Sequence, residues 1–110
     1  MDCAGPFESL PRNSASRGAI AIIGAPTDVG AGVPGARLAP DALRLAKIVQ
    51  RLSLCGRDVV DLGNLTGPPN PEQGPHRGYR HLREVVAWNS TVHSAVLGAL
   101  AQGQVPVLLG

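Results

Sequence analysis

The chain has 110 residues, 44% of them hydrophobic, so it can bury one core but leaves no room for a second domain. Its net charge of +2 is spread along the chain, without the run of Lys or Arg that a phosphate-binding surface needs. An aromatic content of 3% also argues against a stacking surface for single-stranded nucleic acid, so we expect no nucleic-acid partner.

Residues 1–17 contain acidic residues and prolines and lack an apolar segment, so they predict a loose leader and neither a signal peptide nor a membrane anchor. The longest apolar runs, residues 19–26 and 105–109, are far too short to span a bilayer, and we expect no membrane partner. Cys3 and Cys55 have no C-x-x-C or metal-type spacing, which predicts reduced thiols in a cytoplasmic protein.

A strand, a loop and a helix follow the leader. Residues 19–23 form a continuous apolar run rich in Ile, which is typical of a strand covered on both faces. A loop then runs to Ala39, and Pro40 suits the first helical position because its missing N–H is not needed there. Apolar residues at three- and four-residue spacing continue one helix to about Cys55, and Gly56 is its expected C-cap.

The same order then repeats. Residues 59–62 predict a second strand, and the proline-rich stretch 66–78 must be a long surface loop. Helical spacing runs from Leu82 to Leu100, and residues 105–109 predict a third strand. This β-α-β-α-β order predicts an α/β fold, a three-layer α/β/α sandwich with a parallel sheet. Ligands of such sheets bind beyond the carboxyl ends of the strands.

One glycine pattern deserves a test as a phosphate site. Gly30, Gly32 and Gly35 spell G-x-G-x-x-G, whose backbone can approach a dinucleotide pyrophosphate at a helix N-terminus. The first glycine should leave the strand directly, yet six residues separate it from Ile23, and Pro40 would break a helix that began at Gly35. A nucleotide-binding module therefore stays only as an alternative.

Two loop carboxylates could serve a site at the sheet edge. Asp28 lies just beyond the first strand, and Asp61, near the end of the second, is where a ribose-binding acid would be expected. Asp commonly accepts hydrogen bonds from nearby N–H groups in turns, so we interpret Asp28 as a loop residue and Asp61 as a cap of the turn at Gly63.

His81 and Glu84 are three residues apart on the predicted second helix, a spacing that can place two metal ligands on one face, and His93 lies further along. Three neighbouring arginines oppose a bound cation, so we interpret the pair as a contact on a solvated helix face. They are Arg77, Arg80 and Arg83. Nothing local marks Ser53, Ser90 or Cys55 as an activated nucleophile.

Three segments together carry a family resemblance. They are residues 20–44 (IAIIGAPTDVGAGVPGARLAPDALR), residues 61–65 (DLGNL) and residues 103–110 (GQVPVLLG). Their order resembles the N-terminal part of arginases, in the ureohydrolase family. The loop from Asp28 to Pro40 has the arginase-type length, whereas agmatinases, which share the look of residues 34–37 (PGAR), usually have one residue more.

The chain departs from the family pattern at a few positions. Ala39 stands where Gly usually precedes the helix-opening proline, and Val33 and Pro34 replace a basic residue that many arginases have ahead of the glycine. Asn64 stands where Asp is usual. These departures concern the substrate side of the pocket and leave the strand and helix pattern intact.

The resemblance implies that the full-length protein hydrolyses L-arginine to L-ornithine and urea with two Mn²⁺ ions, as a homo-oligomer (trimer or hexamer). In the family, the strand that ends here at Gly110 leads into a G-G-D-H-S motif whose Asp or His residues bind manganese. The resemblance therefore implies no catalytic, cofactor-binding or metal-binding residue in this chain, which we expect to be inactive alone. Alternatives are an agmatinase or another guanidino-compound ureohydrolase, or a non-catalytic truncated α/β module.

Overall fold

The computed structural model describes residues 18–110, so the expected loose leader, residues 1–17, lies outside the described part. The elements follow one another in the order strand, short helices, strand, long helix and strand. They are β1 (Ile20–Gly24), the 3₁₀ helix η3 (Ala36–Leu38), α1 (Ala39–Leu45), α2 (Ile48–Leu54), β2 (Val59–Asn64), α3 (Leu82–Ala101) and β3 (Val105–Leu109).

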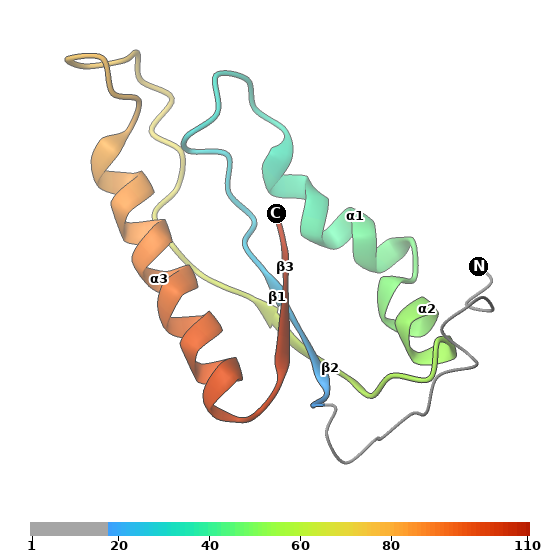
Figure 1. Ribbon diagram of the computed structural model, residues 1–110. Helices are drawn as coiled ribbons and strands as arrows, with labels where there is room; N and C mark the ends of the chain where they lie inside the picture. Colours follow the sequence, from blue (N-terminus) through green and yellow to red (C-terminus); the bar gives the residue numbers. More distant parts are fainter. Residues whose placement is uncertain (1–17) are drawn as a thin grey trace.

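All three strands are parallel, and the first strand in the chain is the middle one, giving the order β2-β1-β3. Ile20 pairs with Val59 on one side and with Val105 on the other. The predicted parallel β-α-β-α-β arrangement is confirmed, and Figure 1 shows the strands running side by side between the helices.

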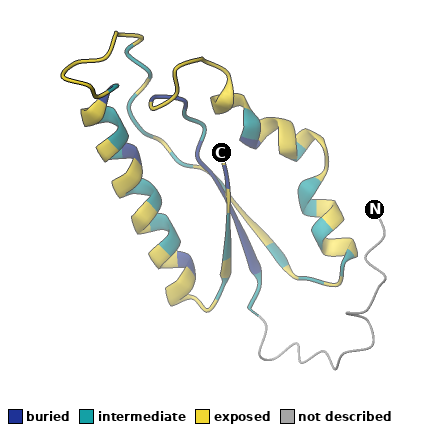
Figure 2. Cartoon of the chain, turned by 45° about the horizontal axis from the view of Figure 1, so that its top comes forward, coloured by how far each residue is buried: buried dark blue, intermediate teal, exposed yellow. Residues whose placement is uncertain are grey.

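The helices cover opposite faces of the sheet, and the alternation along β1 explains how (Figure 1). Ile20 and Ile22 pack with residues of α2, whereas Ala21 and Ile23 pack with residues of α3. Because successive strand residues point to opposite faces, a strand covered on both sides must be apolar throughout. Every residue of β1 is buried (Figure 2), which confirms the three-layer sandwich.

The single helix expected from Pro40 to Cys55 is wrong, because the structure has two short helices there, α1 and α2. Lys47, between them, has a φ of 68° in the left-handed region, which ends the helical path. The change of direction allows the second helix to lay Ile48 and Leu52 on the core face of the sheet. Residue spacing within the segment could not show this, since packing against the sheet decides it.

The other boundaries are close to those expected. β2 continues past the expected Leu62 to Asn64, and its pairing with β1 shifts register opposite Gly63, which has a φ of 81°. A glycine at such a place is typical of a strand irregularity. Residues 66–78 contain no helix or strand, as predicted from their prolines.

Cys55 follows α2 and is disulfide-bonded, so the prediction of reduced thiols is wrong for this residue. Cys3 lies outside the described residues. Within residues 18–110, no helix is long and apolar enough to cross a membrane.

Candidate functional site

Two long loops leave the sheet at the same edge, where β1 and β2 end. The β1 loop comprises residues 25–35 and the β2 loop residues 65–80. Leu65 N–H donates to the Gly24 carbonyl at 2.8 Å, so the loops start beside each other. Figure 1 shows both rising above the carboxyl ends of the strands, which is where ligands of parallel sheets bind.

Asp28 organises the β1 loop from inside. Its side chain is only 1% exposed. The carboxylate accepts hydrogen bonds from Gly35 N–H at 2.9 Å, from Arg37 Nη1 at 3.0 Å and from Asn70 Nδ2 at 2.9 Å. The Gly35 and Asn70 bonds, aided by the Arg37 guanidinium, outweigh burial and lower the pKa of Asp28 to about 2. The interpretation of Asp28 as an acceptor for loop N–H groups is confirmed.

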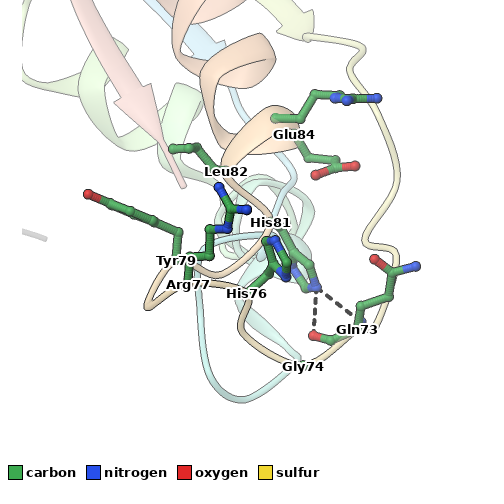
Figure 3. Close-up of a pocket in the computed structure, with 9 residues that line it drawn as sticks. Gln73, Gly74, His76, Arg77, Tyr79, His81, Leu82 and Glu84 are labelled. Carbon is green, nitrogen blue, oxygen red and sulfur yellow. Dashed lines mark hydrogen bonds between the residues drawn. The ribbon is translucent and has the colours of Figure 1, made fainter.

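His81 lies at the start of α3, and its role differs from the one expected. It precedes the helix in a left-handed conformation, with a φ of 50°, and makes no bond to Glu84. Its ring is buried instead between the loops, with Nδ1 2.7 Å from the Val29 carbonyl. Figure 3 shows the contact on the other side of the ring, where Nε2 lies 2.9 Å from the Gln73 carbonyl. The expected contact on a solvated helix face is therefore wrong.

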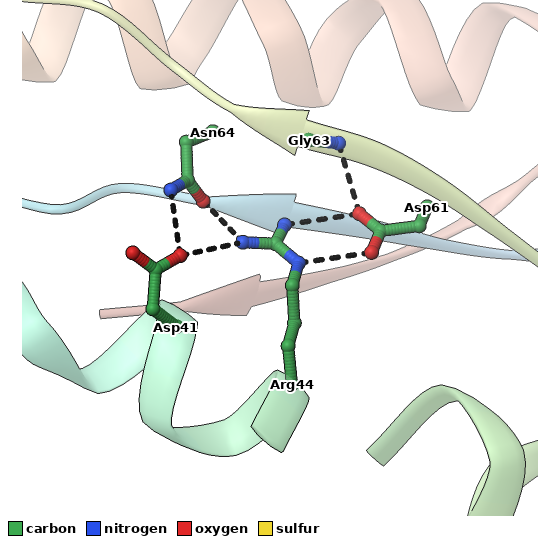
Figure 4. A network of polar contacts seen from close by, with 5 residues as sticks. All are labelled: Asp41, Arg44, Asp61, Gly63 and Asn64. Carbon is green, nitrogen blue, oxygen red and sulfur yellow. Dashed lines mark hydrogen bonds and ion pairs between the residues drawn. The ribbon is translucent and has the colours of Figure 1, made fainter. Parts of the chain in front are cut away.

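Asp61 belongs to a polar network between β2 and α1 (Figure 4). Both of its oxygens accept hydrogen bonds from Arg44 at 2.9 Å, and Oδ1 also accepts Gly63 N–H at 2.9 Å, which confirms the expected cap of that turn. The Arg44 hydrogen bonds lower the pKa of Asp61. Asn64 accepts from Arg44 through its amide oxygen and donates to Asp41 at 3.1 Å through its nitrogen.

The amide at Asn64 suits both of its partners. A carboxylate here, the usual residue of the pattern, would lie against the Asp41 carboxylate and could not donate to it. The amide fits at the end of β1 because Gly24 has no side chain, and a Cβ at this position would collide with Asn64.

The glycine pattern does not form a pyrophosphate cradle. Gly30 and Gly32 lie within the β1 loop, and Gly35, with a φ of 132°, precedes a 3₁₀ helix before α1 starts at Ala39. The Gly35 N–H is already donated to Asp28 and is not available to an anion.

The remaining candidates are scattered. Ser53 lies in α2, whereas Ser90 and His93 lie in α3, and their side chains make no hydrogen bond within the described part. Asn70 and Gln73, which the sequence did not single out, are the residues of the β2 loop that reach Asp28 and His81.

Hollows border the loops in the described part of the chain. One, of about 680 Å³, has His76, Arg77 and Tyr79 in its wall (Figure 3), and Arg83 also lines it. A second, about 240 Å³, lies between the loops, and a third of about 430 Å³ is lined by further residues of both. Among residues 18–110, no group of three or more His, Cys, Asp or Glu side chains could hold a metal ion. These residues therefore do not fit the two manganese ions that the resemblance implies.

The parallel sheet, its two covered faces and the loops at its carboxyl edge define an α/β protein with a loop-built site region. The Arginase family model matches residues 18–110. The arginase of Agrobacterium fabrum is 36% identical over 90 residues, covering 81% of this chain and 28% of that protein. The arginase of Bacillus caldovelox is 34% identical over 94 residues, covering 83% of this chain and 31% of that protein.

Solved structures agree with these sequence relatives. The native Bacillus caldovelox arginase superposes with a TM-score of 0.68 at 32% identity, covering 83% of this chain and 31% of that one. A Bacillus subtilis arginase gives a TM-score of 0.69 at 29% identity over 82% of this chain and 29% of that one. The chain belongs to the arginase family. It spans less than a third of the length of these relatives.

Proposed function

We propose that residues 18–110 form the N-terminal part of a ureohydrolase that hydrolyses L-arginine to L-ornithine and urea. The match of the family model to all of the described residues carries the proposal. In this proposal the protein works in the cytoplasm as a homo-oligomer, and its manganese ligands lie outside these residues.

The proposed part of this segment in the reaction is to shape the entrance to the site. The β1 and β2 loops stand at the edge where parallel sheets bind ligands. Two acids that follow or end these strands are already engaged, Asp28 by donors of both loops and Asp61 by Arg44. Because these bonds occupy both carboxylates, we assign the reacting groups to residues outside 18–110.

Agmatine is the second candidate substrate. Residues 34–37 share the agmatinase-like sequence PGAR, and Arg37 of this segment bonds to Asp28. The length of the loop from Asp28 to Pro40 favours L-arginine, because agmatinases usually have one residue more.

Urea release tests the proposal. We would compare the 110-residue chain with a chain that includes the residues encoded after Gly110 in its natural reading frame, each incubated with Mn²⁺ and either L-arginine or agmatine. We expect urea only from the longer chain, and faster from L-arginine.

Metal-stripped samples of both chains are the control. If the longer chain releases urea faster from agmatine than from L-arginine, agmatine becomes the proposed substrate. Manganese-dependent urea release by the 110-residue chain, free of longer protein, would place the site within these residues and contradict the proposal.

A further inference from the structure

The β1 and β2 loops are joined to each other by side chains at two separate points. Asn70 of the β2 loop donates to Asp28 of the β1 loop at 2.9 Å. His81, just after the β2 loop, contacts the carbonyl of Val29 in the β1 loop at 2.7 Å and the main chain of Gln73 in the β2 loop. We call these side-chain-mediated contacts the loop clamp; Nε2 of His81 makes one of its two contacts with Gln73 at a time.

The donor and acceptor roles of the two His81 ring nitrogens follow from their partners. A carbonyl oxygen only accepts, so Nδ1 must carry a proton and donate to Val29. In the neutral ring Nε2 accepts the Gln73 N–H at 3.0 Å, and in the charged ring it donates to the Gln73 carbonyl at 2.9 Å. The ring can therefore hold both loops in either protonation state.

Backbone conformations near the clamp are uncommon for residues with side chains. His81 has a φ of 50° and Glu72 a φ of 56°. Such left-handed positions persist where the surrounding contacts determine them, and they gather at functional sites. Here the ring contacts of His81 and the Glu72 N–H bond to Asn70 at 2.8 Å supply those contacts.

The clamp also sets the wall of the hollow between the loops. That hollow, about 240 Å³, is lined by Thr27, Asp28 and Arg37 on one side and by Pro68, Asn70 and Glu72 on the other. Since Asp28 and Asn70 belong to the lining and bond across it, the spacing of the two walls depends on this bond.

We propose that Asn70 and His81 are positioning residues, which join the two loops into one rigid rim that orients the guanidino substrate as it enters the site. The proposal rests on the proposed function and deepens it, because the rim acts on substrate binding and touches none of the reacting atoms. Loosening the rim should therefore weaken binding of the substrate while leaving the chemical step unchanged.

Asn70→Asp is the test substitution, because it keeps the acceptor for Glu72 N–H, removes the donor to Asp28 and places two carboxylates together. Asn89→Asp is the matched control, the same chemical change on an exposed position of α3. Asn70→Ala breaks the bond without adding a charge and replaces the first variant if that one fails to fold.

Hydrogen–deuterium exchange of the longer chain, which includes the residues encoded after Gly110, measures how firmly the clamp holds the two loops. Steady-state kinetics of the same chain with L-arginine measure the effect of the clamp on substrate binding. We expect faster exchange in residues 25–35 and 66–75 together, with KM raised about 3- to 10-fold, as for the loss of one hydrogen bond, and kcat unchanged. Asn89→Asp should change neither measurement.

Three results would overturn the proposal. Faster exchange confined to the β2 loop would show that the loops do not form one body. A fall in kcat at constant KM, or unchanged KM despite faster exchange in both loops, would show that the rim does not position the substrate. If the wild-type chain releases no urea from any guanidino compound, the proposed function fails, and the exchange result still decides whether the clamp exists.

Discussion

Replacing Ile22 by Ala should be among the most destabilising changes in the sheet. Ile22 is completely buried in the middle strand and packs in the cluster that includes Ile48 and Leu52 of α2. The substitution removes three carbons, worth about 0.8 kcal/mol each on transfer from water, or roughly 2.4 kcal/mol together. The cavity left behind adds to this, so we expect a total of about 3–4 kcal/mol, within the range of buried Ile-to-Ala changes.

Urea unfolding of the purified protein, followed by circular dichroism, measures this loss. The midpoint should fall while the slope stays the same, since the surface exposed on unfolding hardly changes. Leu54→Ala is the matched control, because Leu54 is 79% exposed and its truncation should alter stability by less than about 0.5 kcal/mol. A cost below about 1 kcal/mol for Ile22→Ala would mean that α2 does not cover this face of the sheet.

Three further results are expected. The pKa of Asp28 is lowered from 3.8 to about 2, so its ionised form stabilises the fold above pH 3.8, and this contribution is lost as the pH falls toward 2. The free energy of unfolding of the wild type should therefore exceed that of Asp28→Asn by less at pH 2 than at pH 4. A larger difference at pH 2 would contradict this expectation. Gly67→Ala should lower the free energy of unfolding, measured by thermal denaturation, by about 1–3 kcal/mol, because its Cβ would lie 2.5 Å from Trp88 Cε2. Gly74→Ala, whose Cβ would point into open space, should leave the stability unchanged. Equal effects of the two substitutions would count against this packing. NAD and ATP should give no binding heat in titration calorimetry, and micromolar affinity would restore the glycine loop as a nucleotide site.

The middle strand β1 could be predicted from sequence because burial on both faces demands an uninterrupted apolar run, as in residues 20–23. The break between α1 and α2 could not, since Lys47 carries no glycine or proline signal and adopts its left-handed φ only in the packed chain. The spacing of apolar residues predicts a continuous helix here, and packing of the segment against the sheet breaks that helix at Lys47.

The same distinction applies to the site. The interpretation of Asp61 succeeded because Gly63, which it caps, is two residues away. The β1-loop partners of Asn70 and His81 are 42 and 52 residues distant, so no spacing rule could join them. The position of His81 just after a proline-rich loop was the signal available in the sequence, and the helical spacing to Glu84 outweighed it.

The place of β1 in the sheet has a consequence for synthesis. Of the three strands, β1 is synthesised first, yet its two hydrogen-bonded neighbours are β2 and β3, and β3 is the last of the three to be synthesised. Pairings between residues so far apart in sequence close large loops and form slowly. The apolar segment Ile20–Gly24 therefore lacks its full set of partners until β3 has been synthesised, and during that time it is an exposed apolar segment to which a chaperone can bind.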